Sequence, residues 1–416
     1  MPTSAKNDTR RRNRHLVLNE IVSAPTVSRT YIAERTGLTG AAVSRITREL
    51  IEAGLVREGR ALEVKGQVGR RNIHLELDGS GAYVLGIVLT ANIQSLSIGD
   101  TCGRILDEHR FENLDLEEPA GVVARMTAEL PGMIDRAGID AKRLVGCGVA
   151  VGGVVDPQSG RLIRSDPLGW NDVPLGAMFG QYLDMPVRIE GRAVALLMVE
   201  HGAAGGSGMG VSEGGAQNVV LISNGQWIGG AMMLDGRVVK GQANMIGQIG
   251  HFAIPGETAA CVCGRSGCLD AVASGSSVLR RISCLSLPEG TGMLAAGERL
   301  RALVMAPDDQ VPEIGQAFRR AGQKMGYAVD ALLAMVDPEL ILLSGATHRH
   351  PEYLRGIHDT LSQVRPSSEG WPVRVNRSTS EHAAIRLALN AFVFSPDLDL
   401  ERLLRVPTKS VSRSTR

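Results

Sequence analysis

Aromatic side chains are scarce in this chain of 416 residues, where Phe, Trp and Tyr together make up 3%. A platform that stacks the bases of single-stranded nucleic acid needs exposed aromatic rings, so the composition argues against one. The sequence also lacks an uninterrupted apolar run of about 18 residues, so no transmembrane helix is expected. Its first 14 residues are polar and basic, without the apolar stretch of a signal peptide, which predicts a cytoplasmic protein.

Cysteine is rare as well, with six in the chain, which is too few for a disulfide framework. Three of them, Cys261, Cys263 and Cys268, nevertheless lie within one short segment. Crowded thiols in a reducing compartment suggest a metal site. Glycine is abundant, at 50 residues, but it follows no period, which excludes a collagen-like fibre and favours the turns of an α/β protein.

The net charge of +1 hides an asymmetry along the chain. Residues 1–78 hold 14 Lys and Arg against 9 Asp and Glu, whereas the remainder is mildly acidic. A small basic head on an acidic body is typical of a nucleic-acid-binding domain joined to another module. Within the head, residues 1–14 show no apolar pattern, and we expect them to form a disordered basic arm.

Residues 15–78 carry the pattern of a winged helix-turn-helix domain. Apolar positions predict a first helix over 16–22, and Ser28 and Thr39 are suitable N-caps for a second and a third. Alternating apolar residues over 73–77 predict a strand that returns from a basic turn. The stretch TYIAERTGLTGAAVSRITRELIEAGLV resembles winged-helix transcription regulators over its full length.

The third predicted helix has an apolar stripe, formed by Val43, Ile46 and Leu50, and an opposite face without acidic residues. Small side chains allow close approach to DNA, while hydroxyls and arginines reach phosphates and base edges. The predicted DNA-binding residues are Arg29, Thr39, Ala41, Ala42, Ser44, Arg45, Arg48, Arg70 and Arg71. The alternative is a three-helix protein-interaction module whose basic face is incidental.

After residue 79, a pattern of three strands, a helix and a further strand occurs twice. Periodicity alone indicates an α/β protein with two lobes. The duplicated architecture resembles the actin-like sugar kinase fold, which has a ligand cleft between its lobes. We expect lobe I over 79–192, completed by a helix over 379–395, then lobe II over 193–378 and a tail over 396–416. Two histidines, His348 and His350, are expected on an exposed turn of lobe II.

The sharpest motif is GQIGHFAIPGETAACVCGRSGCLD, at residues 247–270. One imidazole, from His251, and the thiolates of Cys261, Cys263 and Cys268 can complete a closed tetrahedral zinc site. Such a site is structural, because no position stays open for water. The motif resembles, in spacing and in glycines, the zinc motif of the ROK family of repressors, open reading frames and sugar kinases. We therefore predict one structural Zn²⁺ per chain.

Other segments resemble the same family, among them VGCGVAVGGVVDPQSGRLIRSDPLGWNDVPL, GQANMIGQIGH and ILLSGATH. With the zinc motif, the resemblance covers about residues 80–395. With the winged helix in front, the whole chain resembles ROK transcriptional regulators of the N-acetylglucosamine repressor and xylose repressor kind. This resemblance implies a double-stranded DNA operator, a sugar or sugar-phosphate effector, and a homodimer or tetramer.

The parts that would catalyse phosphoryl transfer are altered. The first phosphate turn of the family's kinases, D-x-G-x-T, has lost its Asp and its glycine here, and Trp227 interrupts the second, glycine-rich turn. Arg192 stands at the position of the catalytic Asp, and a guanidinium cannot accept a proton. We therefore predict a regulator without catalytic residues. The alternatives are an active ATP-dependent sugar kinase with an accessory DNA-binding domain, and a zinc-dependent module that binds a protein.

The sugar contacts implied by the resemblance are altered too, since Gln248 and Asp270 replace two family glutamates. Arg192 supplies a fixed positive charge that suits a sugar phosphate or an acidic sugar. It could equally pair with Glu190 or Asp270 and fill an empty cleft, and both readings stay open. The candidate effector-binding residues are Trp170, Asn171, Glu190, Arg192, Gln248, His251 and Asp270.

Overall fold

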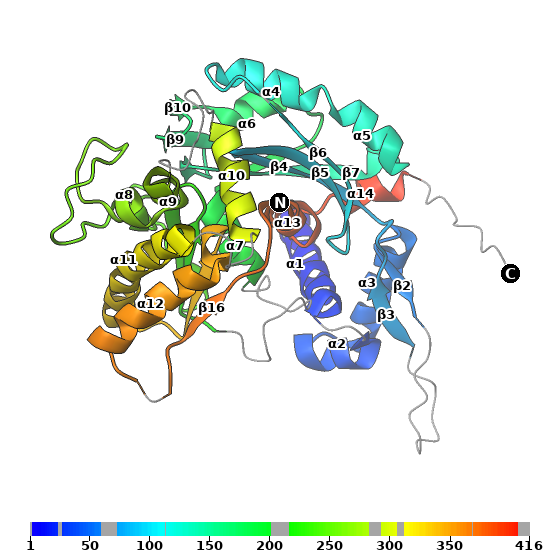
Figure 1. Cartoon of the computed structure of the whole chain (residues 1–416). Helices are drawn as coiled ribbons and strands as arrows, with labels where there is room; N and C mark the ends of the chain where they lie inside the picture. Colours follow the sequence, from blue (N-terminus) through cyan, green and yellow to red (C-terminus); the bar gives the residue numbers. More distant parts are fainter. Residues whose placement is uncertain are drawn as a thin grey trace, which may run out of the picture.

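The structure is a computed structural model, which describes residues 2–23, 27–59, 73–112, 114–200, 216–282, 293–305, 312–367 and 369–406. A small N-terminal domain is followed by a larger body built on two five-stranded sheets (Figure 1). The architecture is the predicted one: α/β, with a winged helix-turn-helix in front of a two-lobed body. Among the described residues, no helix is both long and apolar enough to span a membrane.

The N-terminal domain contains three helices and a small sheet. Ser28 Oγ accepts a hydrogen bond from Tyr31 N at the start of the second helix, and Thr39 Oγ1 accepts one from Ala42 N at the start of the third. Gly37 ends the second helix with φ of 69°, a conformation that favours glycine. The elements are α1 (Pro2–Ser23), β1 (Val27–Ser28), α2 (Arg29–Thr36), α3 (Gly40–Glu52), β2 (Val56–Glu58) and β3 (His74–Leu77), with sheet order β1-β3-β2.

The structure differs from the expectations at both ends of the chain. Residues 2–14, expected as a disordered arm, belong to helix α1. Within the expected tail, a short helix, α14 (Leu400–Leu404), forms, and Leu398 and Leu403 are buried against the N-terminal domain. The buried guanidinium of Arg14 donates to the carbonyl oxygen of Leu398 at 2.7 Å, so these two segments support each other. Residues 407–416 lie outside the described residues.

The two lobes repeat one sheet topology. In each, an antiparallel three-stranded meander continues through its first strand into two parallel strands. Lobe I has the order β11-β7-β4-β5-β6 and lobe II the order β14-β13-β12-β15-β16. The strands of lobe I are β4 (Tyr83–Thr90), β5 (Ile93–Asp100), β6 (Ile105–Arg110), β7 (Leu144–Val151) and β11 (Val187–Gly191). Those of lobe II are β12 (Val219–Asn224), β13 (Ile228–Leu234), β14 (Arg237–Val238), β15 (Leu340–Ser344) and β16 (Val373–Val375).

Helices and short strands cover these sheets. Helices α7 (Arg192–Glu200) and α13 (Ser380–Ala388) pack on each other between the two sheets, and a π-helical turn (Leu389–Val393) follows α13. Lobe I adds α4 (Pro119–Thr127), α5 (Leu130–Ala137), α6 (Leu175–Gly180), β8 (Val154–Asp156), β9 (Arg161–Ser165) and β10 (Trp170–Val173). Lobe II adds α8 (Leu269–Ala273), α9 (Gly275–Ile282), α10 (Met293–Met305), α11 (Pro312–Val336) and α12 (Pro351–Val364).

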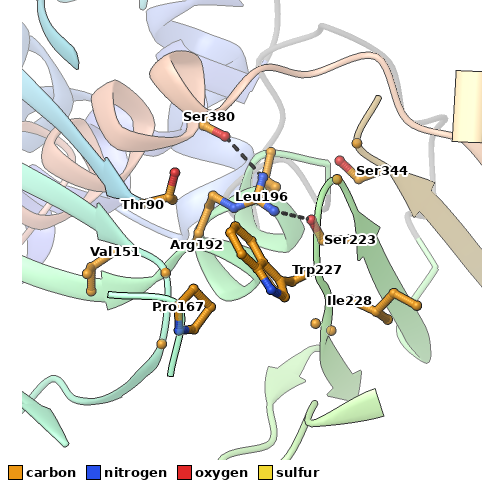
Figure 2. A pocket seen from close by; sticks show the side chains of 18 of the residues that line it. Thr90, Val151, Pro167, Arg192, Leu196, Ser223, Trp227, Ile228, Ser344 and Ser380 are labelled. Atoms are coloured by element: carbon orange, nitrogen blue, oxygen red, sulfur yellow. Dashed lines mark hydrogen bonds between the residues drawn. The ribbon is translucent and has the colours of Figure 1, made fainter. Parts of the chain in front are cut away.

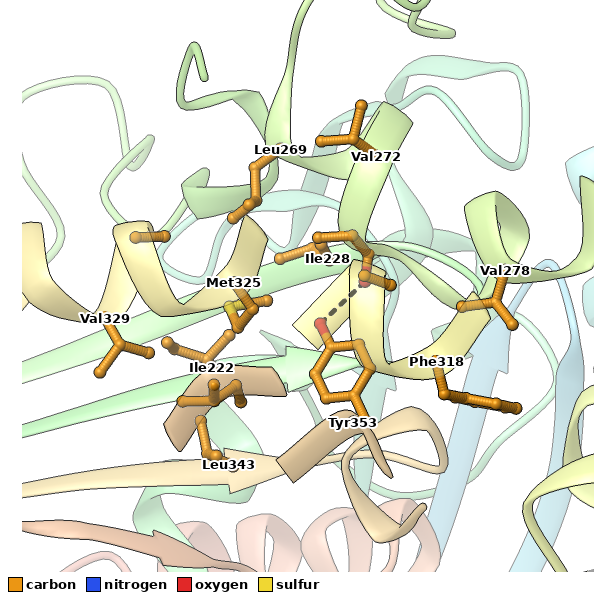
Figure 3. Packing of buried hydrophobic residues seen from close by; sticks show 14 of the residues in the cluster. Ile222, Ile228, Leu269, Val272, Val278, Phe318, Met325, Val329, Leu343 and Tyr353 are labelled. Carbon is orange, nitrogen blue, oxygen red and sulfur yellow. Dashed lines mark hydrogen bonds between the residues drawn. The ribbon is translucent and has the colours of Figure 1, made fainter. Parts of the chain in front are cut away.

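The core of lobe II contains polar groups with specific partners. The fully buried Tyr353 donates its hydroxyl to the carbonyl oxygen of Ala273 at 2.8 Å and packs near Phe318 and Met325 (Figure 3). The expectation that His348 and His350 are exposed is wrong. His348 is fully buried, and His350 caps α12 and stacks on Phe318 with ring centroids 3.9 Å apart.

Candidate functional site

A cavity of about 530 Å³ lies between the two lobes. Hydroxyl side chains line its floor where strands from both sheets reach their carboxyl ends: Thr90 ends β4, Ser344 ends β15, and Ser223 lies next to the end of β12 (Figure 2). Ser380, the first residue of α13, completes the set. Ligands of α/β proteins bind at the carboxyl ends of strands, so this cavity is the candidate effector site.

Arg192 follows strand β11 at the start of α7 and reaches across the cavity floor. Its Nη2 donates to Ser223 Oγ at 2.6 Å and its Nη1 to Ser380 Oγ at 3.3 Å (Figure 2). Burial lowers the pKa of this guanidinium. The reading in which Arg192 pairs with Glu190 or Asp270 is therefore wrong, because its hydrogen bonds go to two hydroxyls from different lobes.

The two acids have other partners. Glu190 is buried and accepts from Lys240 Nζ at 3.1 Å. Asp270 is buried too, and its Oδ1 accepts from the backbone N of Ile228 at 2.6 Å. Burial raises the pKa of Asp270 to about 6. Both carboxyl groups thus lie on the cavity wall. Glu190, on β11, is bonded to Lys240, and Asp270 is bonded to the first residue of β13.

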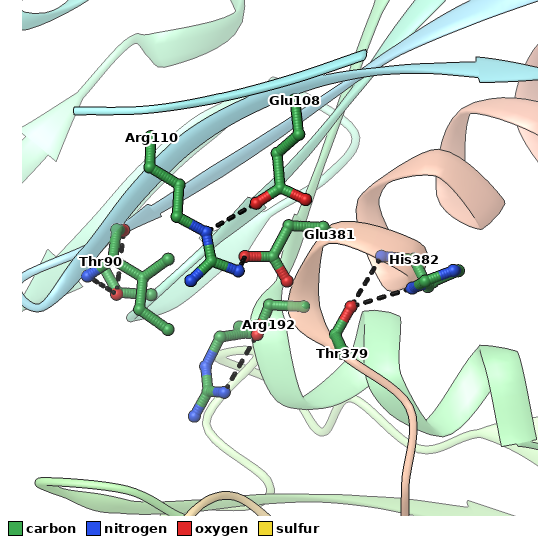
Figure 4. Close-up of polar contacts among 9 residues, drawn as sticks. Thr90, Glu108, Arg110, Arg192, Thr379, Glu381 and His382 are labelled. Carbon is green, nitrogen blue, oxygen red and sulfur yellow. Dashed lines mark hydrogen bonds and ion pairs between the residues drawn. The ribbon is translucent and has the colours of Figure 1, made fainter. Parts of the chain in front are cut away.

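A third acid, Glu381, lies beside the cavity floor at the start of α13. It is buried, and its Oε1 accepts from Arg110 Nη2 at 3.1 Å (Figure 4). The same guanidinium of Arg110 also pairs with Glu108, at 2.6 Å. Glu381 is therefore paired with Arg110 and forms no ion pair with Arg192.

Trp227 projects into the same cavity as Arg192 (Figure 2). It belongs to the turn between β12 and β13, in lobe II, yet its side chain packs against the core of lobe I. The turn between β4 and β5 is closed on itself, because Thr90 Oγ1 accepts from Ile93 N at 3.0 Å and donates to Asn92 Oδ1 at 3.0 Å. The Thr90 hydroxyl thus occupies one backbone donor of its turn, whereas Gly225 and Gly229, on either side of Trp227, have open space where a Cβ would lie.

Five of the seven predicted effector-binding residues line this cavity: Glu190, Arg192, Gln248, His251 and Asp270. The other two do not. Trp170 is buried in the core of lobe I, with its Nε1 donating to the carbonyl oxygen of Leu116, and Asn171 is exposed on β10. The sequence reasoning missed Ser223, Ser344 and Ser380. The first two could have been found, since each lies at or next to the carboxyl end of a predicted strand.

His251, Cys261, Cys263 and Cys268 come together, with one candidate ligand atom from each and all four within 4.8 Å of one another. Cys263 Sγ lies 3.7 Å from Cys268 Sγ, and His251 Nδ1 lies 3.8 Å from Cys261 Sγ. Tetrahedral zinc with bonds of about 2.3 Å spaces its sulfur ligands by roughly 3.8 Å, so the four residues fit this metal. Gly267, with φ of 73°, brings the loop so close that an added Cβ would lie 2.4 Å from Glu257 O.

On the N-terminal domain, the predicted face of α3 is open to solvent. Arg45 and Arg48 are exposed, as are Thr39 and Ala41, while Ala42 and Ser44 are half-buried. Arg29 is engaged within the domain, because its Nε donates to Thr47 Oγ1 at 3.0 Å and its Nη2 pairs with Glu58 at 2.8 Å. Arg70 and Arg71 lie outside the described residues.

In comparisons with known proteins, both parts of the chain match family models. Residues 85–389 match the sequence model of the ROK family, and residues 9–63 match that of the MarR family. The chain is 26% identical, over 390 residues, to the xylose repressor of Caldicellulosiruptor bescii, a match that covers 92% of this chain and 95% of the relative.

Solved structures agree on the fold. A ROK family transcriptional regulator, described as a homologue of the E. coli MLC protein, matches with a TM-score of 0.70 and 22% identity, over 96% of this chain and 100% of its own. A ROK family glucokinase from Streptomyces griseus, in complex with glucose and AMPPNP, matches with a TM-score of 0.61 and 21% identity, over 74% of this chain and 100% of its own. The first match covers nearly the whole chain and so includes the N-terminal domain. The second covers a share of the chain that corresponds in length to the two-lobed body.

Proposed function

The chain belongs to the ROK family, and from this premise we propose that it is a DNA-binding transcriptional repressor whose body binds a carbohydrate effector without phosphorylating it. The ROK match spans the two lobes and the MarR match spans the N-terminal helices. A xylose repressor of similar length aligns with nearly the whole chain. These matches support a regulator over the alternatives of a protein-interaction module and a protein-binding zinc scaffold.

The observation that carries the proposal is the exposed face of α3. Arg45 and Arg48 point away from the apolar stripe and, within the part of the chain that the structure describes, form no ion pair. Arg29 pairs with Glu58, so we assign it the role of positioning α3 rather than contacting DNA. The proposed partner is a double-stranded operator, bound by a homodimer or tetramer, because helix-turn-helix proteins place two recognition helices about one DNA turn apart.

The cavity supports binding more than catalysis. Arg192 stands where a general base would have to accept a proton, and Trp227 takes up space beside the phosphate turn of lobe II. Because a glucokinase shares this fold, the fold alone does not decide between binding and phosphoryl transfer. The proposed effector contacts are Glu190, Arg192, Gln248, His251 and Asp270, all on the cavity wall.

Zinc would be held by His251, Cys261, Cys263 and Cys268, where it would supply structural stability to lobe II. We propose one ion per chain, with no part in a reaction. The repressor relatives, together with the basic helix-turn-helix domain, favour a location in the cytoplasm, where the DNA of a bacterial cell lies.

Selection of DNA fragments from the source genome by the full-length protein tests this function. We expect a small set of fragments to be enriched, and Arg45→Ala or Arg48→Ala to weaken binding by roughly 1–3 kcal/mol if the arginine reads a base. A phosphate contact would instead weaken all sequences alike and reduce the salt dependence. Arg136→Ala is the control, since Arg136 pairs with Asp107 on the surface of lobe I. Equal binding by wild type and both α3 variants would contradict the assignment.

A further inference from the structure

The guanidinium of Arg192 is a cation on the cavity floor without an acidic partner. Both of its hydrogen bonds go to neutral hydroxyls, those of Ser223 and Ser380. Within the described ranges, no carboxylate forms an ion pair with it; Glu190, Asp270 and Glu381 each have another donor. A buried charge is costly to a protein unless a counter-charge lies close to it.

The rest of the cavity wall supplies little of that counter-charge, since Glu381 attracts the guanidinium without bonding to it and forms its ion pair with Arg110. Its acids are fewer than its cations among the described lining residues, and the acid on β9–β10, Asp166, is bonded by Arg164 at 2.5 Å. The cations are Arg110, Arg164, Arg192, Lys240, Arg301 and Arg349, and the acids are Asp166, Glu190, Asp270 and Glu381. The cavity therefore has an excess of positive charge, with Arg192 at its floor.

The surroundings of Arg192 also suit an anion. Ser223, Ser344 and Ser380 place hydroxyl groups in the same cavity, and each can donate a hydrogen bond, whereas the Thr90 hydroxyl donates within its own turn (Figure 2). The first residues of α13 line the same wall, so the positive end of that nine-residue helix adds to the potential there. A guanidinium presents parallel N–H groups that match the oxygens of a carboxylate or phosphate.

We propose that the effector is an anionic sugar, carrying a phosphate or a carboxylate, and that Arg192 binds this group on the cavity floor. The inference rests on the proposed function, in which this cavity binds a carbohydrate effector. Arg192 stands at the position of the catalytic Asp of the family's kinases. A guanidinium at that position cannot take a proton from a sugar hydroxyl, but it can bind a negatively charged group of the ligand. A neutral sugar would leave Arg192 without a directly bonded counter-charge.

Calorimetry on the full-length, zinc-loaded protein tests the inference with matched probes. Glucose, glucose 6-phosphate and glucuronate share a ring and differ in charge, as do xylose and xylose 1-phosphate; inorganic phosphate serves as the anion alone. We expect at least one anionic sugar to bind about tenfold or more tightly than its neutral counterpart. The phosphate and carboxylate members show which of the two groups is recognised. Arg192→Gln should abolish this preference, while the surface control Arg136→Gln should keep it.

Three outcomes would overturn the inference. A neutral sugar that binds wild type and Arg192→Gln equally well leaves the repressor function intact but refutes the anionic effector. If inorganic phosphate binds as tightly as the sugar phosphate, the site holds an adventitious ion only and does not recognise the sugar. No binding by any charged probe, in protein that binds its operator, refutes it as well. If Arg192→Gln does not fold, the neutral and anionic pairs on wild type still decide, with Ser223→Ala as a milder variant. Operator binding by the wild-type protein without effector is measured separately, and its failure would contradict the proposed function itself.

Discussion

The side chain of Arg143 donates a hydrogen bond to the carbonyl oxygen of Ala53, the residue that follows helix α3, at 3.2 Å. The same buried guanidinium donates to Gly81 O at 2.5 Å, between the two domains, and to Val406 O at 2.7 Å, near the C-terminus. One cation of lobe I therefore joins the DNA-binding domain, the linker and the C-terminal segment. A single hydrophobic cluster spans the same three segments.

We expect Arg143→Met to destabilise the protein by on the order of 3 kcal/mol, because it leaves buried carbonyl oxygens without a donor. The change should also loosen the N-terminal domain from the body, so that urea unfolding followed by far-UV circular dichroism shows two transitions. Arg136→Met, on the surface of lobe I, is the control and should lie within about 0.5 kcal/mol of wild type. A single transition with unchanged midpoint in Arg143→Met would show that the hydrophobic cluster alone joins the domains.

Purified protein should contain about one zinc ion per chain, and Cys263→Ser should release it. Cys261 and Cys268 belong to the core cluster of lobe II, so metal loss should lower the thermal stability of that lobe. Elemental analysis and differential scanning calorimetry measure the two effects. Cys102→Ser, which changes an exposed cysteine outside this cluster, should alter neither. Well under half an equivalent of zinc in protein purified without chelator would contradict the assignment.

His348 makes a contribution to the free energy of unfolding that should be lost as the pH is lowered from about 6.5 to 4. Burial lowers the pKa of this fully buried imidazole from 6.5 to about 4, so the unfolded chain binds a proton in this range that the folded chain does not. The contribution is present above pH 6.5 and is lost as pH falls through the folded pKa; its full size is about 3 kcal/mol. Asp270, with its pKa raised from 3.8 to about 6, acts in the opposite direction over a similar range.

Urea unfolding of wild type and His348→Asn at pH 7 and pH 5 separates these terms. The variant should be less stable than wild type at pH 7, since Ser344 O loses the partner 2.9 Å away, but it should lose less stability on acidification. Asp270→Asn should show the reverse, a steeper loss. Parallel curves for wild type and His348→Asn would mean that the imidazole titrates normally in the folded protein.

Features written in short segments of the chain could be predicted from the sequence. The N-caps Ser28 and Thr39 act on backbone groups three residues away, and the four zinc ligands lie within 18 residues. The pairing of Arg192 could not be predicted, because its partner Ser380 lies 188 positions away. The helical structure of residues 2–14 could not be predicted for the same reason, because Arg14 donates a hydrogen bond to Leu398 O, 384 positions further on.

Of the residues that the resemblance assigned to the effector site, some lie in the cavity and others do not. Cavity residues next to a turn or strand end, such as Gln248 and Arg192, were placed correctly in the cleft. Trp170 was not, because a large apolar ring is more stable in the core of lobe I, and the hydrogen bond of its Nε1 to Leu116 O removes the cost of burying that donor. His348 shows the same effect for a polar ring, whose burial is stabilised by Ser344.

The protein should not bind ATP or phosphorylate a sugar. Trp227 interrupts the glycine-rich turn of lobe II, the Thr90 hydroxyl occupies the backbone N of Ile93 in the turn of lobe I, and Arg192 cannot act as a base. General-base catalysis alone is worth about 10²–10⁴-fold in rate, and positioning of the phosphates supplies much of the remainder. Calorimetry with millimolar ATP and an assay for ADP formation, over hexoses, pentoses and amino sugars, should therefore give no signal. Arg192→Asp should not restore turnover, because a new base leaves both turns unchanged. The double variant Arg192→Asp with Trp227→Gly tests whether the Trp227 side chain also prevents nucleotide binding. Saturable ATP binding by wild type together with sugar-dependent formation of ADP would establish the kinase instead.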